Sequence, residues 1–287
     1  MNGIVTKCIG GLYTVETPDG TYDIKARGVF RNKGISPCVG DNVRIENGVI
    51  SEIMPRRNVI VRPPIANLDC LIFVVSACQP SPNFLLLDKF IAIAEYKGIT
   101  PVIAVTKTDI ADCSQLSQIY GKIGVRLIEV DYSDKRTVDE VRSVLHNKTS
   151  AFTGNSGVGK STLLNAIDPT LNLATGEISK KLGRGRHTTR HASLYKLSCG
   201  GYIADTPGFS TFETAQYDII RKEELAGCFR EFSEFTADCR FKDCSHTGEK
   251  GCGILEAVKN GGISQMRHQS YCIMYDEAKL IKEWELK

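Results

Sequence analysis

Short apolar and polar stretches alternate through residues 1–65, and this pattern predicts β-strands joined by tight turns. Two pairs of alternating stretches flank the Gly-containing turns PDG and ENG; the pairs are GLYTVET with TYDIKAR, and DNVRI with VISEI. Such pairs are typical of β-hairpins. About five short strands in a span of this length predict a small closed barrel of the OB-fold type.

A different pattern follows the segment RPPIANLD (62–69), which we interpret as a stiff linker because of its two prolines. Apolar stretches then alternate with helical patterns: LIFVVSA, FLLLDKFIAIAEYKG, PVIAVTK, VRLIEVD, TVDEVRSVLHN and SAFTG. This alternation predicts an α/β domain whose mostly parallel sheet is covered on both faces. Ligands of such sheets bind outside the carboxyl ends of the strands. Beyond about residue 212 the pattern is helical and rich in cysteine.

We therefore expect three domains: an OB-fold domain at 1–65, an α/β domain at 66–211 and a mainly helical domain at 212–287. A chain of 287 residues is long enough for several cores. The longest apolar stretch, around CLIFVVSA, is much shorter than the roughly 18 to 20 residues that cross a bilayer. Because the first residues also lack the features of a signal peptide, we expect a cytoplasmic protein that does not contact a membrane.

Positive charge is concentrated at the start of the chain. Residues 1–65 hold nine basic and six acidic residues, a surplus equal to the formal net charge of +3 of the whole chain. A net charge of this size does not imply nucleic acid by itself. OB barrels, however, often bind nucleic acid on one face, and Tyr13, Tyr22 and Phe30 are candidate stacking residues. The first domain is therefore a candidate RNA-binding domain, and a solvated barrel with core aromatics is the alternative.

The segment GNSGVGKS (154–161) fits the P-loop pattern, in which a Gly-rich loop follows a strand and opens a helix. Backbone N–H groups of such a loop surround phosphates; here Lys160 would reach the β- and γ-phosphates and Ser161 would bind Mg²⁺. The candidate phosphate-binding residues are Gly154, Asn155, Ser156, Gly157, Val158, Gly159, Lys160, Ser161 and Thr162.

The segment TKTD (106–109) ends a predicted strand and is a candidate for recognition of a base. The carboxylate of Asp109 can accept two hydrogen bonds from guanine N1–H and N2–H₂, while the stem of Lys107 lies along the ring. Adenine has no such paired donors, so the segment favours GTP over ATP. Thr106 stands where Asn is more usual, and Thr108 completes the candidate GTP-binding set. EVDYSD (129–134) is a weaker candidate for backbone contacts to the base.

Two further segments are candidates for the magnesium ion and a nucleotide-dependent switch. In YIADTPGFS (202–210), Asp205 would hold Mg²⁺ mostly through water, and the Gly208 N–H would sense the γ-phosphate. In the basic loop KKLGRGRHTTRHA (180–192), Thr189, in preference to Thr188, would close over Mg²⁺. A merely solvated basic loop is the alternative.

The segment CRFKDCSHTGEKGC places Cys239, Cys244, His246 and Cys252 in a C-x4-C-x-H-x5-C arrangement. Three thiolates and one imidazole match a closed, structural zinc site. Because the segment is polar and Gly-rich, metal binding would supply much of its folding free energy. Farther on, Arg267 and Tyr271 lie in a helical pattern, where we expect packing rather than contact with RNA.

Taken in order, these motifs resemble the circularly permuted, ribosome-associated GTPases of the RsgA (YjeQ/YloQ) type, and the resemblance covers essentially the whole chain. TKTD precedes GNSGVGKS, GRGRHTT, DTPG and the Cys/His cluster, as in that family. The order can differ from that of other GTPases because every motif sits on a loop at one edge of the sheet. Since DTPG leads directly into the third domain, nucleotide state is hypothesised to be transmitted there.

The resemblance implies a GTP hydrolase that binds the small ribosomal subunit and its rRNA late in maturation, with hydrolysis stimulated by the subunit. It also implies that His187 positions the attacking water, because Phe209 occupies the place after DTPG where many GTPases carry Gln. We expect a monomer with one structural Zn²⁺ and with Mg²⁺ bound alongside GTP.

Two other classes of protein stay open from the residues alone. One is a nucleic-acid-binding protein whose GTP site only stabilises the fold, and the other is a P-loop ATPase or kinase, which TKTD opposes. A potassium-activated GTPase is a further variant, and Gly157 opposes it because such proteins tend to carry Asn there.

Overall fold

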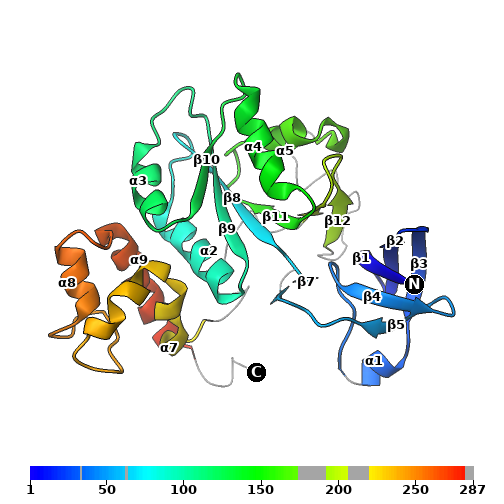
Figure 1. Ribbon diagram of the computed structural model, residues 1–287, viewed down its shortest axis with the longest axis horizontal. Helices are drawn as coiled ribbons and strands as arrows, with labels where there is room; N and C mark the ends of the chain where they lie inside the picture. Colours follow the sequence, from blue (N-terminus) through cyan, green and yellow to red (C-terminus); the bar gives the residue numbers. More distant parts are fainter. Residues whose placement is uncertain (33, 62–63, 174–191, 206–219, 282–287) are drawn as a thin grey trace.

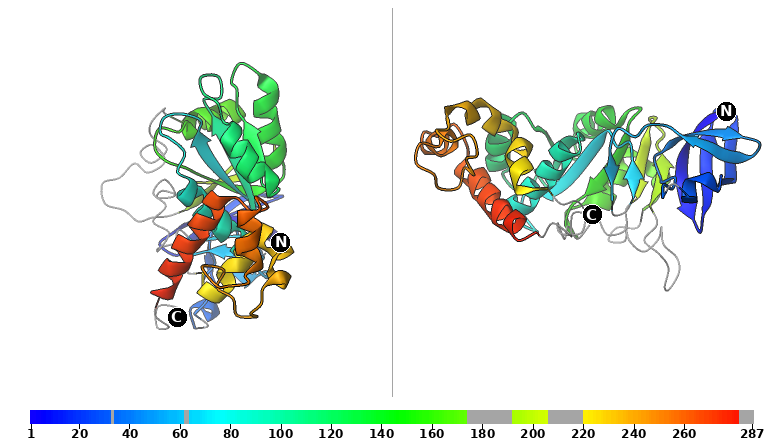
Figure 2. Two further views of the ribbon diagram at one scale, coloured as in Figure 1. Left: turned by 90° about the vertical axis from the view of Figure 1, so that its left-hand side faces the viewer. Right: turned by 90° about the horizontal axis from the view of Figure 1, so that it is seen from below.

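Three modules follow one another along the longest axis of the molecule, in the same order as in the chain (Figures 1 and 2). The structure is a computed structural model, and it describes residues 1–287 except 33, 62–63, 174–191, 206–219 and 282–287. The barrel lies at one end, the α/β sheet in the middle, and a helical module with the Cys/His cluster at the other end (Figure 1).

The N-terminal module is a closed five-stranded barrel, as predicted. Its strands pair in the order β1-β2-β3-β5-β4, and β4 pairs again with β1. Valine and isoleucine side chains fill its interior, where Val5, Val15 and Ile50 are fully buried. The elements are β1 (Asn2–Ile9), β2 (Leu12–Thr17), β3 (Gly20–Ala26), α1 (Val29–Asn32), β4 (Asn42–Glu46) and β5 (Val49–Ile53).

The three aromatic residues proposed as stacking surfaces on the barrel have different environments. Tyr13 is buried in the barrel core, and Phe30 is partly buried against it. Tyr13 therefore matches the alternative of core aromatics, and Phe30 packs at the edge of the same core. Tyr22 is 37% exposed and is the one member of this set that remains available at the surface.

The segment expected to be a stiff linker is a packed connection. Within it, Ile65 and Leu68 are buried together with Val39 of the barrel module. Two short strands, β6 (Val59–Ile60) and β7 (Ile65–Ala66), pair antiparallel here. Asp69 accepts hydrogen bonds from Arg57 Nη1 (2.6 Å) and from the backbone N of Thr149 (2.9 Å). The prediction of a stiff linker does not hold for residues 65–69, because Ile65 and Leu68 join the core of the next module.

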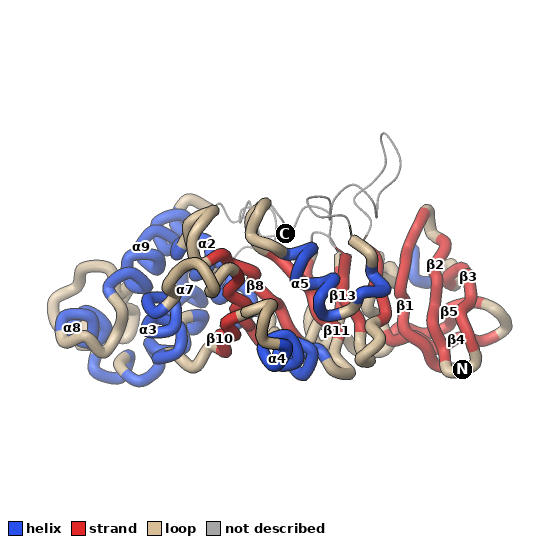
Figure 3. The backbone as a smooth tube through the Cα atoms, turned by 90° about the horizontal axis from the view of Figure 1, so that it is seen from above, coloured by secondary structure: helices blue, strands red, loops and turns tan. Residues whose placement is uncertain are grey.

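The central module is built on a six-stranded sheet in the order β10-β9-β8-β11-β13-β12. Neighbouring strands are parallel except for β12, which runs antiparallel to β13 and also pairs with β1, so that strands continue into the barrel (Figure 3). The strands are β8 (Cys70–Ser76), β9 (Thr100–Thr106), β10 (Arg126–Glu129), β11 (Thr149–Thr153), β12 (Ser193–Lys196) and β13 (Tyr202–Asp205).

Helices cover both faces of this sheet, which explains why every residue of β8 is buried. Leu71 and Phe73 point to the face packed by α2 and α3, whereas Ile72 and Val74 point to the face packed by α4 and α5. The helices are α2 (Phe84–Tyr96), α3 (Ser114–Lys122), α4 (Lys135–Leu145) and α5 (Lys160–Ile167), followed by the 3-10 turn η1 (Pro169–Leu171).

Helix α3 and strand β12 are elements that the periodicity did not predict. Helix α3 buries only Leu116 and Tyr120, so its apolar stripe is a single pair of positions. Strand β12 has four residues, of which only Leu194 is buried. Both elements are too short to show a period in the sequence, and their neighbours in the fold determine them.

The C-terminal module packs short helices around an aromatic cluster that includes Phe229, Phe232 and Tyr271. Helix α9 packs against α2 of the central module. The elements are α7 (Lys222–Leu225), η3 (Ala226–Cys228), η4 (Arg230–Glu234), η5 (Thr236–Asp238), α8 (Gly253–Lys259) and α9 (Gln265–Lys279). Among the described helices, none combines the length and the apolarity needed to cross a membrane.

A buried ionic network fastens the C-terminal module to the central one. Arg267 is 1% exposed; its Nη1 donates to Asp88 Oδ1 (2.8 Å), and its Nε donates to Glu231 Oε1 (2.8 Å). Tyr120 donates its hydroxyl to Asp88 Oδ1 (2.9 Å), and the guanidinium carbon lies 4.6 Å from the centre of the Phe229 ring. Burial raises the pKa of Asp88, and the charge of Arg267 opposes that rise. Arg267 is thus a packing residue, as expected, and so is the buried Tyr271.

We predict that Arg267→Met lowers the free energy of unfolding by about 3 kcal/mol or more, because two buried carboxylates lose their cation. The loss should shrink as the pH falls, since a carboxyl with a raised pKa in the folded state favours folding when it is protonated. Urea unfolding followed by circular dichroism at several pH values measures both effects.

The matched control is Arg126→Met, which breaks an exposed pair with Glu140 (3.2 Å). There we expect a change of less than about 1 kcal/mol. Similar small effects for the two substitutions would contradict a structural role for the buried network.

Candidate functional site

The carboxyl ends of four parallel strands bring the sequence motifs to one edge of the sheet. Strands β10, β9, β8 and β11 are consecutive neighbours (Figure 1). The segments that follow them begin at residues 130, 107, 77 and 154, so they form a row in that order. TKTD and GNSGVGKS, which lie far apart in the chain, are therefore close in space.

The 154–161 loop depends on glycine where it passes β8. Gly154 has a φ of 140°, and a Cβ atom there would lie 2.1 Å from the carbonyl oxygen of Val74. Gly159, at a φ of 93°, begins helix α5 in the left-handed conformation. Only glycine adopts such angles without strain, so the loop can approach β8 and turn into the helix.

Lys160 is the first residue of α5, and its side chain folds back over the loop. Its Nζ donates to the carbonyl oxygens of Gly154 and Asn155, the latter at 2.7 Å. No carboxylate in the described part of the chain forms an ion pair with it, and burial lowers the pKa of Lys160 to about 8. The ammonium is therefore held at the helix N-terminus, where an anion would be its natural partner. Ser161, in the same turn, is buried.

A hydrogen bond from Thr106 joins the TKTD segment directly to this loop. The buried Thr106 hydroxyl donates to the carbonyl oxygen of Val158 at 2.6 Å and also lies 3.3 Å from the carbonyl oxygen of Val75. Thr106 replaces the more usual Asn, and its hydroxyl makes the link without an amide. The departure from the usual residue therefore does not separate the two motifs.

The other TKTD residues reach outward from the same edge. Lys107 has a φ of 59°, and its Nζ donates to the carbonyl oxygens of Gln79 and Gly157, the latter at 3.2 Å. The Thr108 hydroxyl donates to the carbonyl oxygen of Val130 at 3.1 Å. Asp109 is exposed, and no described residue donates a hydrogen bond to its carboxylate. The edge thus offers a cation at Lys160 and a free carboxylate at Asp109.

Several predicted site residues are not part of this geometry. Strand β13 ends at Asp205 beside β11, at the same edge of the sheet. The side chain of Asp205 and the residues His187, Thr189 and Gly208 lie outside the described residues. The roles predicted for these four residues therefore stay predictions.

The four residues with zinc-ligand spacing come together in the C-terminal module. The ligand atoms of Cys239, Cys244, His246 and Cys252 all lie within 4.8 Å of one another. The sulfurs of Cys239 and Cys252 are each 3.5 Å from His246 Nδ1. Zn–S bonds of about 2.3 Å and tetrahedral angles place ligand atoms roughly 3.5 to 3.8 Å apart, so the residues fit one zinc ion. Four protein ligands leave no position for a substrate.

Residues outside the Cys/His motif hold its loop in place. The ring Nε2 of His268, on α9, lies 2.8 Å from the carbonyl oxygen of His246, and Tyr271 donates to the carbonyl oxygen of Ser245 at 2.8 Å. Glu249 accepts from the backbone N of Ser245; although burial raises its pKa, hydrogen bonds from Ser245 and nearby backbone N–H groups lower it to about 2. These supports have no ligand spacing, so no motif in the sequence marks them.

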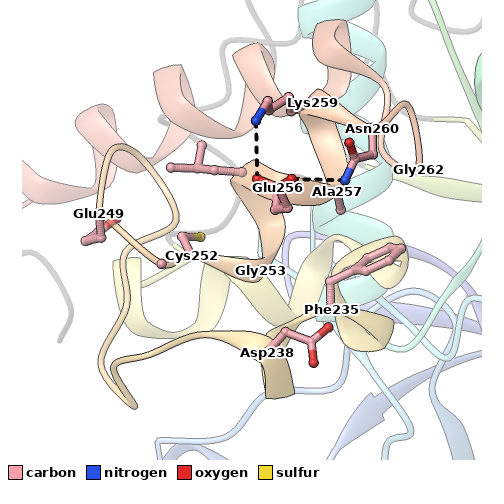
Figure 4. A pocket seen from close by; sticks show the side chains of 12 residues that line it. Phe235, Asp238, Glu249, Cys252, Gly253, Glu256, Ala257, Lys259, Asn260 and Gly262 are labelled. Carbon is pink, nitrogen blue, oxygen red and sulfur yellow. Dashed lines mark hydrogen bonds and ion pairs between the residues drawn. The ribbon is translucent and has the colours of Figure 1, made fainter.

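A cavity of about 680 Å³ opens beside this cluster (Figure 4). Cys252 and Phe235 line it, and Glu256 on its wall pairs with Lys259 (3.9 Å) and accepts from Asn260 (3.2 Å). All of its lining residues belong to the C-terminal module. It is separate from the candidate nucleotide site.

Comparison with known proteins agrees with this geometry over the full chain. A family model described as RsgA GTPase matches residues 53–215, and one described as RsgA N-terminal domain matches residues 2–50. The small ribosomal subunit biogenesis GTPase RsgA of Alkaliphilus metalliredigens is 42% identical, covering 96% of this chain and 97% of that protein. The protein of the same name from Streptococcus pneumoniae is 43% identical, with coverages of 99% and 96%.

Two solved structures share the fold. The crystal structure of YjeQ from Thermotoga maritima superposes with a TM-score of 0.83 at 33% identity, covering 98% of this chain and 99% of that chain. The structure of YloQ, described as a circularly permuted GTPase, gives a TM-score of 0.78 at 34% identity, with coverages of 97% and 94%. Both agree with the predicted order of motifs around a permuted sheet.

We predict that the purified chain contains one zinc ion and that a strong chelator lowers its melting temperature, because metal binding contributes folding free energy to this polar segment. Cys244→Ser should reduce the zinc content, measured by atomic emission, from one per chain towards zero. The control Cys199→Ser, at a half-buried cysteine outside the cluster, should retain the metal. Full zinc content in the Cys244→Ser protein would exclude the cluster as the site.

Proposed function

The chain belongs to the RsgA GTPase family and is a GTP hydrolase, and from this premise we propose that it binds the small ribosomal subunit late in its maturation and that the subunit stimulates hydrolysis. The observation that best supports a guanine nucleotide site is the direct link between TKTD and the 154–161 loop. Thr106 bonds Val158, and Lys107 bonds Gly157, so a base held by one segment has its phosphates at the other.

In this proposal Asp109 recognises the guanine edge, Lys107 lies along its ring, and the 154–162 segment surrounds the phosphates. Lys160 contacts the β- and γ-phosphates when they displace its present carbonyl partners. Magnesium supplies charge neutralisation on the phosphates when it is bound, and Ser161 is the described residue that would hold it. Asp205, Thr189 and Gly208 complete the proposed magnesium and switch set.

We assign positioning of the attacking water to His187. The support is the resemblance to the family, together with Phe209, directly after DTPG, which can neither donate nor accept a hydrogen bond, whereas an imidazole can do both. A GTPase without a Gln at this place is expected to turn over slowly until a partner orders its catalytic loop.

The N-terminal barrel is proposed to make contact with the rRNA of the subunit. On the barrel, Tyr22, Lys7 and Lys25 are exposed and offer a ring and two cations to rRNA. The Cys/His cluster is proposed to bind one structural zinc ion, which fixes the fold of the module at the opposite end.

Hydrolysis of GTP with and without purified small subunits tests the partner. We expect the subunit to raise the turnover rate, and neither large subunits nor free RNA to do so to the same extent. Excess ATP should not compete with GTP. Equal stimulation by large subunits would show that the proposed partner is wrong. An absence of single-turnover hydrolysis would show that the protein binds GTP without hydrolysing it. In the same assay His187→Ala should lose the stimulated rate while still binding GDP; a retained rate would exclude its role.

The pKa of Lys160 predicts how GDP binding depends on pH. Burial lowers this pKa to about 8 in the nucleotide-free protein, and bound phosphates favour the charged ammonium and so raise it. Affinity should therefore stay level near pH 7 and fall by up to about tenfold per pH unit above pH 8, where binding must take up a proton. Calorimetric titration measures this profile.

Lys160→Arg is the control for the pH profile, because a guanidinium stays charged throughout this range. Its affinity for GDP, whatever its absolute value, should be independent of pH over the same interval. A level profile for the wild-type protein would contradict the proposed contact between the Lys160 ammonium and the phosphates.

A further inference from the structure

The row of loops along the sheet edge places the proposed base between two different walls. The position of the proposed base is set by Asp109, which follows β9. On one side lie β8 and β11, and the Lys107 side chain extends that way, to Gln79 and Gly157. On the other side lies β10, whose following loop begins at Val130. A planar ring held at Asp109 therefore has one face covered by the Lys107 stem and the other turned towards that loop.

The loop after β10 is fixed by its own hydrogen bonds. Val130 donates to the carbonyl oxygen of Val105 (2.7 Å) and accepts from the Thr108 hydroxyl (3.1 Å), which ties the loop to TKTD. The Asp131 carboxylate accepts from the backbone N of Ser133 (2.8 Å), and the Thr137 hydroxyl donates to the carbonyl oxygen of Asp131 (2.8 Å). Tyr132 sits in the middle of this turn, so its backbone is held by bonds on both sides.

Tyr132 is a partly exposed side chain with no polar or aromatic partner among the described residues. It is 41% exposed, and within the described part of the chain it forms no hydrogen bond and no contact with another aromatic ring. Burial of part of the side chain, followed by the charge of Asp109, raises the pKa of Tyr132 to about 12. The charge of Asp109 thus reaches the phenol, which stays protonated at neutral pH.

We propose that Tyr132 is a base-binding residue, whose ring stacks on the face of the guanine that the Lys107 stem does not cover. The inference rests on the proposed guanine nucleotide site. It assigns to this turn a side-chain contact in addition to the backbone contacts for which the segment was a candidate. Stacking on an aromatic ring tolerates any base, so Tyr132 supplies affinity while Asp109 supplies the choice of guanine.

The test measures binding of GDP to the full chain by displacement of a fluorescent GDP analogue. Tyr132→Ala should weaken GDP binding by about tenfold or more, and Tyr132→Phe, which keeps the ring, by less than about twofold. Phe241→Ala removes an aromatic ring that is 47% exposed in the C-terminal module, and it should leave binding unchanged.

Two readouts separate a contact with the base from a structural role. Pyrophosphate, which occupies the phosphate loop without a base, should displace the analogue with the same inhibition constant from the wild-type and Tyr132→Ala proteins, once the weaker analogue binding is corrected for. The melting temperature without nucleotide should also be unchanged. Wild-type affinity for GDP in Tyr132→Ala, or equal weakening in Tyr132→Phe, would overturn the stacking role and leave the proposed function intact. Failure of the wild-type chain to bind GDP would overturn both.

Discussion

The hydrogen bond from the Thr106 hydroxyl to the carbonyl oxygen of Val158 joins two segments 52 residues apart, and it ties the base-recognising segment to the phosphate loop of the candidate nucleotide site. It forms because β9 and β11 flank β8 in parallel, so the loops after them leave the same edge of the sheet. A site built in this way depends on which strands are neighbours and not on their order in the chain. This explains how a circularly permuted GTPase keeps its phosphate loop and its base-recognising segment together, although the second precedes the first in the sequence.

The same sheet carries a second connection, to the C-terminal module. Helix α9 contributes Arg267 to the buried network with Asp88 on α2, and its next residue, His268, contacts the loop of the Cys/His cluster. Helix α2 in turn follows the segment in which the Gln79 carbonyl oxygen accepts from Lys107. Helix α2 therefore connects the sheet edge, through Arg267 and His268 of α9, to the Cys/His cluster. The order of motifs suggested a different connection to the C-terminal module, through the segment after DTPG, and that segment lies outside the described residues. These contacts provide a route between the nucleotide site and the C-terminal module. Energetic coupling of the two would require two conformational states that differ along this route.

The predictions that failed share a physical cause. Helix α3 and strand β12 are short and have few buried positions, so their local pattern is weak and packing decides them. The prolines of the 62–69 segment predict a stiff linker, but Ile65 and Leu68 are buried against the modules on either side. Tyr13 lies on the same face of its strand as Val15, and the closure of the barrel puts this face inside. In each case the deciding neighbour is distant in the chain, where periodicity carries no information.

The sequence by itself determined the three modules, the hairpins of the barrel, the parallel sheet and the motifs with fixed spacing, because these depend on residues a few positions apart. The glycines of the 154–159 loop and the four Cys and His residues could be recognised as motifs for that reason. Tertiary packing was needed to show that Thr106 bonds Val158 without an amide, that Arg267 pairs with Asp88 across 179 positions, and that Tyr132 forms no hydrogen bond within the described part of the chain. Such meetings follow from how strands and helices pack, and packing is determined by the whole chain at once.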